Sequence, residues 1–482
     1  MILPWLSSIY LLAAAGIALF GLLGLVTLVY YWRHRHETFP CPPIQDANLP
    51  QVTVQLPIYN ERFVVGRLID AAVQLDYPRE KLQIQVIDDS TDDTTEIANA
   101  IVHKYLAHGV NIELFHRTHR NGYKAGALED ALKRATGDYI AVFDADFQPQ
   151  SDFLRQTVPH FISEPDLGMV QTRWGHLNPF ESQLTAAQTI ALDKHFAMEQ
   201  TVRHRASLFP KFNGSAGVWR RQCLLDAGGW EADTVCEDLC LSTRAILKGW
   251  QFRFLNEVVS PAELPTTISA YKNQQSRWAK GSTQCLVKFG PKILTNQKQS
   301  LIARIYALLS MSGYTTHLLL LILLLVQVPL IYLNYHPPPI LLAFGLAGIA
   351  QPILFIMGQR ELYVDWGNRI RYFPALLLVA IGLAPSNSRA IVQAVVVRQH
   401  TFIRTPKGGK TKWADLPTNT LSTGNYRLAV DWIVIIELLL AIYATIGLIL
   451  CFWQGNFGPS FFMLSCALGF GYVALSTIRD HF

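Results

Sequence analysis

Pairs of aspartates close two apolar segments in the first third of the chain, Asp88 with Asp89 and Asp144 with Asp146. An unpaired carboxylate is costly to bury, so an apolar run that ends in two acids is unusual. In an extended segment Asp144 and Asp146 point to the same side and can hold one hard divalent cation, with phosphate oxygens completing its coordination. The alternative is a solvated turn at the end of a strand, where aspartate is also favoured.

Two further groups carry charge at the predicted start of a helix. Lys124 lies within Asn121–Leu128, where glycines flank the beginning of a helical stretch. Backbone N–H groups together with an ammonium group suit a diphosphate at such a position. Glu237 and Asp238 form another acidic pair directly before a helical stretch.

Gln274, Arg277 and Trp278 are spaced at i, i+3 and i+4, which places them on one face of a helix. A tryptophan with neighbouring hydrogen-bond donors can stack on a sugar ring and bind its hydroxyl groups. The alternative is an interfacial anchor before a membrane span, because tryptophan and arginine both favour the membrane interface.

Apolar segments alternate with helical stretches around these residues, and four of the segments read as strands: Val52–Leu56, which ends at Pro57, Ile84–Ile87, Ile112–Phe115 and Tyr139–Phe143. Strands that alternate with helices predict a mostly parallel sheet with helices on both faces. Ligands in such folds bind at the carboxyl ends of the strands, and the aspartates collect there.

The composition excludes several classes of protein. Half of the 482 residues are apolar and 16% are charged, with 41 Lys and Arg against 36 Asp and Glu, a net charge of +5. This charge-poor, apolar chain is the opposite of a disordered one, and its small positive excess gives no electrostatic footprint for nucleic acid. The seven cysteines form no CxxC pair, so neither a zinc site nor a disulfide scaffold is expected.

Long apolar segments predict five membrane spans: Ser8–Tyr31, Ile305–Leu333, Pro339–Met357, Trp432–Trp453 and Phe457–Ile478. The first has 24 residues without a charge, which cover roughly 36 Å as a helix, enough to cross a bilayer. We interpret it as a retained span and not a cleaved signal peptide, because it lacks a basic start and a short apolar core.

The basic residues that flank the spans predict the topology. Arg33, Arg360 and Arg479 each follow a span, whereas the short connections after the second and fourth spans contain no lysine or arginine. The positive-inside rule then places the N-terminus outside, and the middle region and the C-terminus on the cytosolic side.

Two features of the apolar segments leave alternatives open. Phe373–Val397 is interrupted by Pro385–Arg389 and has basic residues on both sides, so it must cross an even number of times. A re-entrant or interfacial helix pair gives five full spans, and two crossings would give seven. Glu437 lies inside the fourth span, where an ionisable residue is a functional hypothesis unless it snorkels to the interface.

The ordered set Asp-Asp, Lys-Ala-Gly, Asp-x-Asp, Glu-Asp and Gln-x-x-Arg-Trp resembles the membrane-embedded processive enzymes of glycosyltransferase family 2. It is most similar to the cellulose-synthase-like branch, which contains glucomannan mannosyltransferases and xyloglucan-backbone glucan synthases. The resemblance rests on six segments: Gln55–Glu61, Asp88–Asp92, Asn121–Leu128, Phe143–Pro149, Phe212–Arg220 and Ala227–Trp230.

The resemblance implies a role for each matching residue. The nucleotide sugar would contact Tyr59, Glu61, Asp89, Lys124 and Asp144. Mg²⁺ or Mn²⁺ would be held by Asp144 and Asp146, and Asp238 would be the general base. The acceptor would be bound by Gln274, Arg277, Trp278, Phe212, Asn213, Gly214 and Ser215.

Phe402, Thr405 and Lys407 match the Phe-x-x-Thr-x-Lys gating loop of cellulose synthases. A hydroxyl and an ammonium group on this glycine-rich segment could close over a bound diphosphate. The alternative is a basic loop beside the membrane that touches anionic lipid.

The resulting domain map has five parts. An N-terminal transmembrane helix (1–36) precedes an α/β glycosyltransferase domain of GT-A type (50–298), with a Rossmann-like mixed sheet and interfacial helices at its C-terminal end. A transmembrane hairpin (299–358), an interfacial or re-entrant segment with the gating loop (359–427) and a second hairpin (428–482) follow.

The expected function is an inverting enzyme that polymerises a β-1,4-linked glycan from a nucleotide sugar and translocates it across a bacterial inner membrane or its equivalent. A glucan from UDP-glucose is favoured over a mannan or glucomannan from GDP-mannose. The alternative is a non-processive enzyme that makes a glycosyl-diacylglycerol or a glycosylceramide. Expected partners are the growing glycan and membrane lipids, with no nucleic acid, and the sequence leaves the oligomeric state undetermined.

Overall fold

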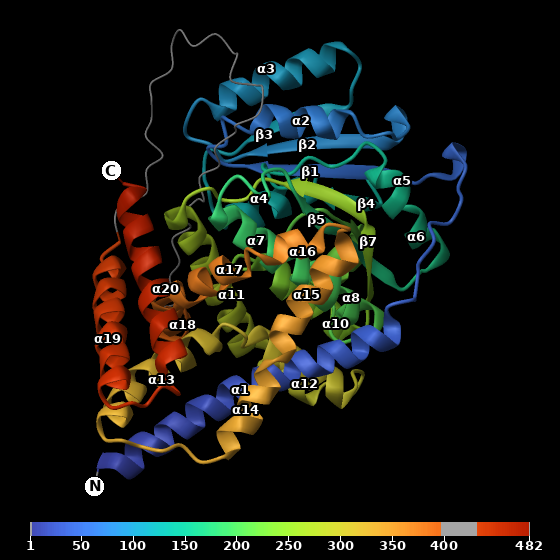
Figure 1. The fold of residues 1–482 in the computed structure, drawn as a ribbon. Coiled ribbons are helices and arrows are strands. Elements are labelled where there is room, and N and C mark those ends of the chain that lie inside the picture. Colours follow the sequence, from blue (N-terminus) through green and yellow to red (C-terminus); the bar gives the residue numbers. More distant parts are fainter. Residues whose placement is uncertain (1, 397–430, 482) are drawn as a thin grey trace.

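The computed structural model describes residues 2–396 and 431–481, and a seven-stranded sheet forms its largest layer (Figure 1). The strands are β1 (Val52–Ile58), β2 (Leu82–Asp88), β3 (Ile112–His116), β4 (Tyr139–Val142), β5 (Leu167–His176), β6 (Gly217–Arg220) and β7 (Gln251–Ala262). Their order across the sheet is β3-β2-β1-β4-β6-β5-β7. Neighbours from β3 to β4 are parallel, β6 is antiparallel to both β4 and β5, and β5 is parallel to β7. The sheet is therefore mixed, as expected for a GT-A domain.

The first strand continues through Pro57, where the sequence suggested that it would end. The carbonyl of Gln55 accepts a hydrogen bond from Phe143 on the β4 side, and the carbonyl of Ile58 accepts one from Asp89 on the β2 side. Backbone groups alternate in direction along a parallel strand, so Pro57 faces the β4 side, beyond the last paired residue of β4. Its missing N–H therefore costs no ladder hydrogen bond.

Helices cover both faces of the sheet, and consecutive residues of β4 point to opposite faces. Ala141 lies in a core with α2 and α3, whereas Ile140 and Val142 lie in a second core with α4, α9, α10 and α11. The helices of this part are α2 (Val65–Val73), α3 (Thr94–Ala107), α4 (Tyr123–Leu132), α5 (Phe153–Thr157), α6 (Pro159–Ser163), α7 (Gln183–Lys194), α8 (Thr201–Arg205), α9 (Arg221–Asp226), α10 (Glu237–Lys248) and α11 (Ile268–Thr295). Short 3₁₀ turns cover Asp46–Asn48 and Arg79–Lys81, and His195–Gln200 is a π-helical segment.

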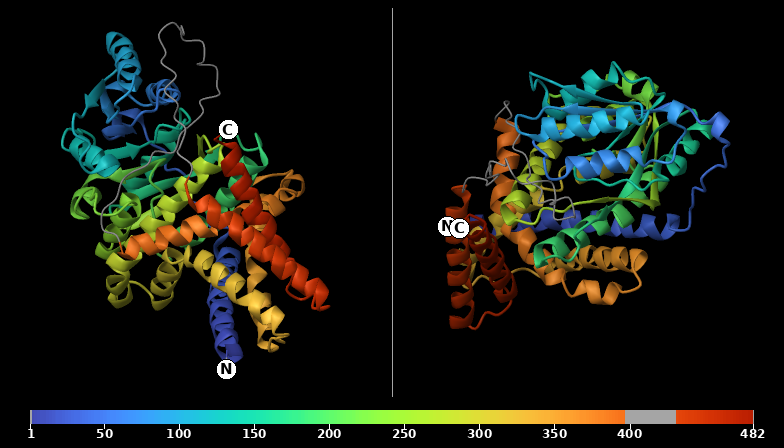
Figure 2. Two further views of the ribbon diagram at one scale, coloured as in Figure 1. Left: turned by 90° about the vertical axis from the view of Figure 1, so that its left-hand side faces the viewer. Right: turned by 90° about the horizontal axis from the view of Figure 1, so that it is seen from above.

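In the described part of the chain, five helices are long and apolar enough to cross a membrane. They are α1 (Ile2–His34), α13 (Thr315–Tyr332), α14 (Ile340–Gly348) continued by α15 (Ala350–Leu362), α19 (Ile433–Trp453) and α20 (Ser460–Arg479). They gather on one side of the sheet domain (Figures 1 and 2). Helices α11, α17 (Phe373–Gly382) and α18 (Ala384–Val396) lie between the sheet domain and the α19–α20 hairpin (Figure 1). A short helix, α16 (Trp366–Ile370), precedes α17.

The segment 305–333, predicted as one span, is divided into α12 (Leu301–Met311) and α13. The hydroxyl groups of Thr315 and Thr316 donate to the carbonyls of Ser312 and Gly313, at 2.7 and 2.8 Å. Such local bonds compete with the helical ladder and stop it here. Helix α12 packs against the core of the sheet domain, so its apolar residues contact that domain.

The helix pair expected in 373–397 is present, but its break lies at Leu383 and not at Pro385–Arg389. Helices α17 and α18 meet at a bend of 44°. Pro385 occupies the first turn of α18, where a proline loses no helical hydrogen bond because the first N–H groups of a helix have no partner within it.

Gly137, at the entry to β4, gives a test of this packing. A Cβ atom there would lie 2.4 Å from the Thr53 backbone nitrogen, which cannot move without displacing β1. Gly137→Ala should cost about 3 kcal/mol by overpacking and lower the unfolding midpoint by roughly 6–12 °C. Thermal unfolding of the purified protein in detergent measures this. Gly367→Ala is the control, because a Cβ there meets nothing within 4 Å. Equal midpoints for the two variants would contradict the prediction.

Candidate active site

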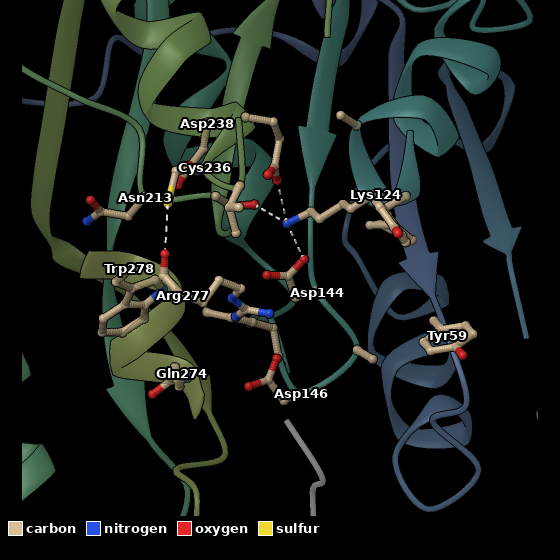
Figure 3. Close-up of a pocket in the computed structure, with 18 of the residues that line it drawn as sticks. Tyr59, Lys124, Asp144, Asp146, Asn213, Cys236, Asp238, Gln274, Arg277 and Trp278 are labelled. Atoms are coloured by element: carbon tan, nitrogen blue, oxygen red, sulfur yellow. Dashed lines mark hydrogen bonds and ion pairs between the residues drawn. The ribbon is translucent and has the colours of Figure 1, made fainter. Parts of the chain in front are cut away.

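A cavity of about 420 Å³ opens at the carboxyl ends of β1, β2 and β4 and is bounded by α4, α10 and α11 (Figure 3). Most of the residues selected from the sequence line it: Tyr59, Glu61, Asp89, Lys124, Asp144, Asp146, Asn213, Gly214, Asp238, Gln274, Arg277 and Trp278. The chain therefore brings together acidic, basic and aromatic groups from segments that are far apart in sequence.

Lys124 lies at the centre of the charged groups. Its Nζ is 2.5 Å from Asp144 Oδ1 and 3.7 Å from Glu237 Oε1, and it donates to the Gly214 carbonyl at 2.9 Å (Figure 3). Burial by itself lowers the pKa of Lys124, but the carboxylates of Asp144 and Glu237 outweigh it and raise the pKa above its usual value. The ammonium group is therefore charged and shared between acids.

The backbone before α4 sets the position of Lys124. Gly122 has φ of +72° and Tyr123 has φ of +50°, so the chain turns through the left-handed region just before the lysine. A Cβ at Gly126 would lie against the Asn121 carbonyl, which leaves glycine as the residue that fits. The predicted glycine-flanked helix start is thus present.

Asp144 and Asp146 both face the cavity, but on a turn and not on the extended segment expected from the sequence. The Phe147 N–H donates to the Asp144 carbonyl at 3.0 Å, which closes the turn. Burial raises the pKa of Asp144, Lys124 opposes this shift, and the neighbouring Asp146 adds to it.

The pair of carboxylates fits a hard divalent cation such as Mg²⁺ or Mn²⁺ in the chemistry of its donor atoms. Within residues 2–396 and 431–481 no group of three or more His, Cys, Asp or Glu side chains has the arrangement of a metal site. A cation held by Asp144 and Asp146 would therefore need further ligands from a substrate or from water.

Asp238 lies in the first turn of α10 and is also within the cavity. Its Oδ1 accepts a hydrogen bond from the Leu239 N–H at 2.8 Å. Burial raises the pKa of Asp238 although Lys124 lowers it, which makes the carboxylate a better proton acceptor. Gly214, with φ of +88°, passes close to it, and a Cβ there would be 3.0 Å from Asp238 Oδ2.

The predicted shared face on α11 is present, with Gln274, Arg277 and Trp278 all lining the cavity (Figure 3). Cys236, just before α10, is 4.0 Å through its Sγ from the Arg277 carbonyl. Gly281 leaves no room for a Cβ against Cys236, so α11 and the start of α10 pack in direct contact.

Two arginines next to Asp89 and Tyr59 were missed by the sequence reasoning, and of these Arg120 lines the cavity. Arg117 binds both oxygens of Asp89, at 2.7 and 2.8 Å. The Arg120 guanidinium lies 3.2 Å from the centre of the Tyr59 ring. The available signal in the sequence was their position directly before the glycine-flanked segment 121–128, because basic residues there can reach the carboxyl ends of β1 and β2.

Two predicted residues do not line the cavity. Phe212 is 1% exposed and packs edge-on against Trp219, with ring centres 5.5 Å apart, so it is a core residue. Ser215 is fully buried, and its Oγ accepts from the Asp144 N–H at 2.9 Å, so it supports the aspartate turn. Phe402, Thr405 and Lys407 lie outside the described residues.

A second group of missed residues lies behind Asn213. The π-helical segment presents His195 and Glu199 together, with Nδ1 of His195 2.8 Å from Glu199 and Nε2 3.4 Å from the Asn213 amide. Burial lowers the pKa of His195 to about 4, so the ring is neutral at pH 7. Its Nδ1–H then donates to Glu199, and its Nε2 accepts from the amide of Asn213, a residue that lines the cavity.

The wall of the cavity is also connected by hydrogen bonds to one of the helices that are apolar enough to cross a membrane. Asp193 of α7 is buried and hydrogen-bonds His176 at 3.0 Å, Gln359 at 2.9 Å and Tyr363 at 3.2 Å. His176 lines the cavity, whereas Gln359 lies on α15 and Tyr363 directly after it. No sequence signal indicated this connection.

Residues 50–281 match the family model "Glycosyltransferase like family 2". Over 290 residues the chain is 40% identical to glucomannan 4-beta-mannosyltransferase 9 of Arabidopsis thaliana, an alignment that covers 58% of this chain and 54% of that protein. It is 39% identical over 280 residues to glucomannan 4-beta-mannosyltransferase 1 of Cyamopsis tetragonoloba (57% and 53% covered). It is 40% identical over 287 residues to glucomannan 4-beta-mannosyltransferase 1 of Oryza sativa subsp. japonica (57% and 55% covered).

The chain thus spans about half the length of these curated relatives. A mannosyltransferase from Pyrobaculum calidifontis, solved in complex with GDP-Man and Mn²⁺, has a similar fold, with a TM-score of 0.56 and 21% identity. That alignment covers 82% of this chain and 100% of the solved one. Residues 50–281 of this chain are therefore a glycosyltransferase family 2 domain with the GT-A fold.

Proposed function

We propose that this chain is an inverting glycosyltransferase that transfers mannosyl units from a nucleoside-diphosphate mannose to a growing β-1,4-linked glycan. The observation that carries the proposal is the single cavity in which Lys124, the Asp144–Asp146 turn, Asp238 and the Trp278 face of α11 meet. These groups supply a diphosphate site, a cation site, a proton acceptor and a sugar platform side by side.

The donor preference from the sequence needs revision. UDP-glucose was favoured there, but the relatives at about 40% identity are glucomannan mannosyltransferases. This similarity supports GDP-mannose as the donor, with glucose as a second sugar if the product is a glucomannan. In this proposal the nucleoside binds next to Tyr59, Arg120 and Asp89, which line the cavity.

The departing diphosphate carries the charge that this site must stabilise. Lys124 reaches the middle of the cavity and can turn from Asp144 to a phosphate oxygen, while Arg277 presents a second positive charge from α11. A divalent cation held by Asp144 and Asp146 would act as a Lewis acid for the leaving group. Fixed positive charges in a partly closed cavity stabilise developing negative charge better than water does.

Asp238 is the proposed general base. Its carboxylate takes the proton of an acceptor hydroxyl while that oxygen bonds to the anomeric carbon of the donor sugar. The bond from the same carbon to the diphosphate breaks as the new bond forms, so an α-linked donor gives a β-linked product. In this proposal Trp278 and Gln274 hold the acceptor ring and its hydroxyl groups, and Asn213 lines the same cavity.

Buried and partly buried polar groups on and next to α11 support a polymer that leaves through the helical layer. The Tyr314 hydroxyl donates to Gln275 Oε1 at 3.0 Å, and the Asn387 amide lies 3.1 Å from His317 Nδ1. Gln275 lies on α11, Tyr314 directly precedes α13, and His317 and Asn387 lie on α13 and α18. Polar side chains among membrane helices are costly and typically mark a path for a polar substrate.

The basic residues that flank the apolar helices support the proposed orientation, with the catalytic domain and the C-terminus on the cytosolic side and the N-terminus outside. The sugar would then be added on the side where nucleotide sugars are made. The roles of the remaining candidates, Glu61, Gly214 and the segment with Phe402, Thr405 and Lys407, follow from the same family resemblance.

The first prediction from the proposed function concerns the donor sugar and the product. Purified protein in lipid nanodiscs, incubated with radiolabelled GDP-mannose, should form polymer that an endo-β-1,4-mannanase degrades. Labelled UDP-glucose alone should give at most one tenth of that incorporation. Label in a chloroform-soluble product, with none in polymer, would instead support a lipid glycosyltransferase. Exclusive use of UDP-glucose would refute the mannosyl donor.

The second prediction concerns Asp238. Asp238→Asn keeps the size of the side chain but removes the proton acceptor, so turnover should fall at least about 100-fold. Binding of GDP, measured by calorimetry, should change less than about threefold because the diphosphate is held from α4 and β4. Asp365→Asn, at an exposed ion pair with Arg369, is the control with unchanged turnover. Retained turnover in Asp238→Asn would remove this residue as the base.

The third prediction concerns the cation. Because two carboxylates supply only part of the coordination, Mn²⁺ should bind weakly to the protein alone and at least about tenfold more tightly with GDP present. Calorimetric titration of Mn²⁺ with and without GDP measures this coupling. Asp146→Asn should abolish it. Equal Mn²⁺ affinities in the two titrations would show that the nucleotide does not share the cation.

A further inference from the structure

A buried ion pair joins the catalytic domain to the last membrane hairpin. Nζ of Lys272, on α11, lies 2.6 Å from Oε1 of Glu437, on α19, and the two side chains are 7% and 0% exposed. Lys272 also hydrogen-bonds Thr477 of α20 at 3.4 Å. Among the described residues, Lys272 is the cation that contacts this carboxylate. Glu437 is thus held inside the helical layer and does not snorkel to the interface.

The start of α11 is held by the same hairpin. The Ser269 N–H donates to Oδ2 of Asp480, the residue that follows α20, at 2.9 Å. Ser269 and Lys272 are three residues apart, so the hairpin contacts the first turn of α11 at two points. The contacts come from both helices of the hairpin, α19 and α20.

The site residues lie on the opposite side of α11. With 3.6 residues per turn, Gln274, Arg277 and Trp278 are about 200°, 140° and 240° around the helix from Lys272. The ion pair therefore contacts the back of the helix while these three side chains face the cavity. A force on Lys272 rotates the helix about its axis and moves all three together.

We propose that the Lys272–Glu437 pair, with Thr477 and Asp480, fixes the rotation of α11 and so positions Gln274, Arg277 and Trp278 for transfer. The inference rests on the proposed function, since it assigns positioning residues to that reaction. Lys272 and Glu437 do not line the cavity and act through the three side chains that do.

The expected size of the effect follows from helix geometry. Side-chain ends lie about 5–6 Å from a helix axis, so a rotation of about 10° moves them about 1 Å. A displacement of about 1 Å in a positioning group can lower a rate about 100-fold. A small change at the back of α11 is therefore enough to impair transfer while the fold stays intact.

A role in stability alone would give a different pattern. Replacing both members of a buried ion pair with apolar residues of similar size is often neutral or stabilising, whereas removing one member leaves an unpaired charge. Lys272→Met/Glu437→Met should therefore keep the fold but lose the directional contact that sets the rotation. The single variants should lose both stability and activity.

The experiment compares Lys272→Met, Glu437→Met and the double variant with Lys280→Met. Lys280 lies on the same helix and has no ion pair among the described residues, so its replacement controls for the loss of a lysine. Thermal unfolding in detergent, GDP binding by calorimetry, and kcat and KM for the acceptor are measured for each. A fifth variant, Glu437→Asp, keeps the charge but shortens the side chain by one methylene group.

In the double variant we expect a melting temperature within about 3 °C of the parent, GDP affinity within about threefold, and kcat lowered at least tenfold. Glu437→Asp should also lower kcat, and Lys280→Met should leave it unchanged. A double variant with full kcat would refute the positioning role. A double variant that loses melting temperature, GDP binding and turnover together would show a merely structural pair. If the parent protein binds GDP but transfers no sugar, the proposed function fails. The ion pair is then judged from Glu437→Asp alone, and a lowered melting temperature with no change in GDP binding contradicts positioning.

Discussion

The candidate site depends on one lysine that balances several carboxylates. Asp144 follows β4, whereas Glu237 and Asp238 begin α10, and bringing these carboxylates together places negative charges in a partly closed cavity. Lys124 offsets this cost through direct contacts with Asp144 and Glu237, which is why its pKa is raised despite burial. The left-handed turn before Lys124 and the glycine at 126 allow the backbone to position that ammonium group. In the proposed function a diphosphate would be a third anionic partner for Lys124, and Asp144 would then need a new counter-charge. The proposed cation meets that need, so nucleotide and cation binding are coupled by electrostatics.

The parts of the site that the sequence predicted share a simple physical reason. Aspartates at the ends of apolar strands and a lysine at a glycine-flanked helix start can be recognised in the sequence. Apolar runs mark the buried strands, and charged groups are excluded from the buried interior, so they stand where the strands end. Contiguous motifs were less reliable. Phe212 to Ser215 form one motif, yet Phe212 packs on Trp219 and Ser215 supports the Asp144 backbone, so neighbours in sequence face different surroundings. Arg117 and Arg120 were missed because an arginine has many possible partners, and only the fold brings Asp89 and Tyr59 to them.

The apolar helices show the same division between local and long-range information. Length and hydropathy in the sequence identified the five helices that are long and apolar enough to cross a membrane in the described part of the chain, because a bilayer imposes a minimum length on any helix that crosses it. The break within 305–333 was not predicted, because it depends on hydroxyl groups that bind carbonyls three residues back, as at Thr315. The break within 373–397 was predicted at the wrong residues, because a proline in the first turn of a helix, as at Pro385, does not interrupt it. The partner of Glu437 could not be identified from the sequence, because Lys272 is on a helix of a different domain and nothing in the local sequence of a lysine indicates which carboxylate it contacts.

The cost of buried charge explains both sides of α11. On the cavity side, Arg277 faces carboxylates and a proposed diphosphate, so its charge is compensated by substrate or protein. On the opposite side, Lys272 has no substrate to meet and is compensated by Glu437 of the hairpin. A helix with uncompensated charge on one side would turn to expose it, and compensation on both sides removes that tendency. Asp193 makes a comparable connection from the cavity wall to α15 through Gln359. If the ion pair positions α11 as proposed, helices that are apolar enough to cross a membrane hold Gln274 and Trp278 in place, and a movement of those helices during product release would reach these side chains through Lys272.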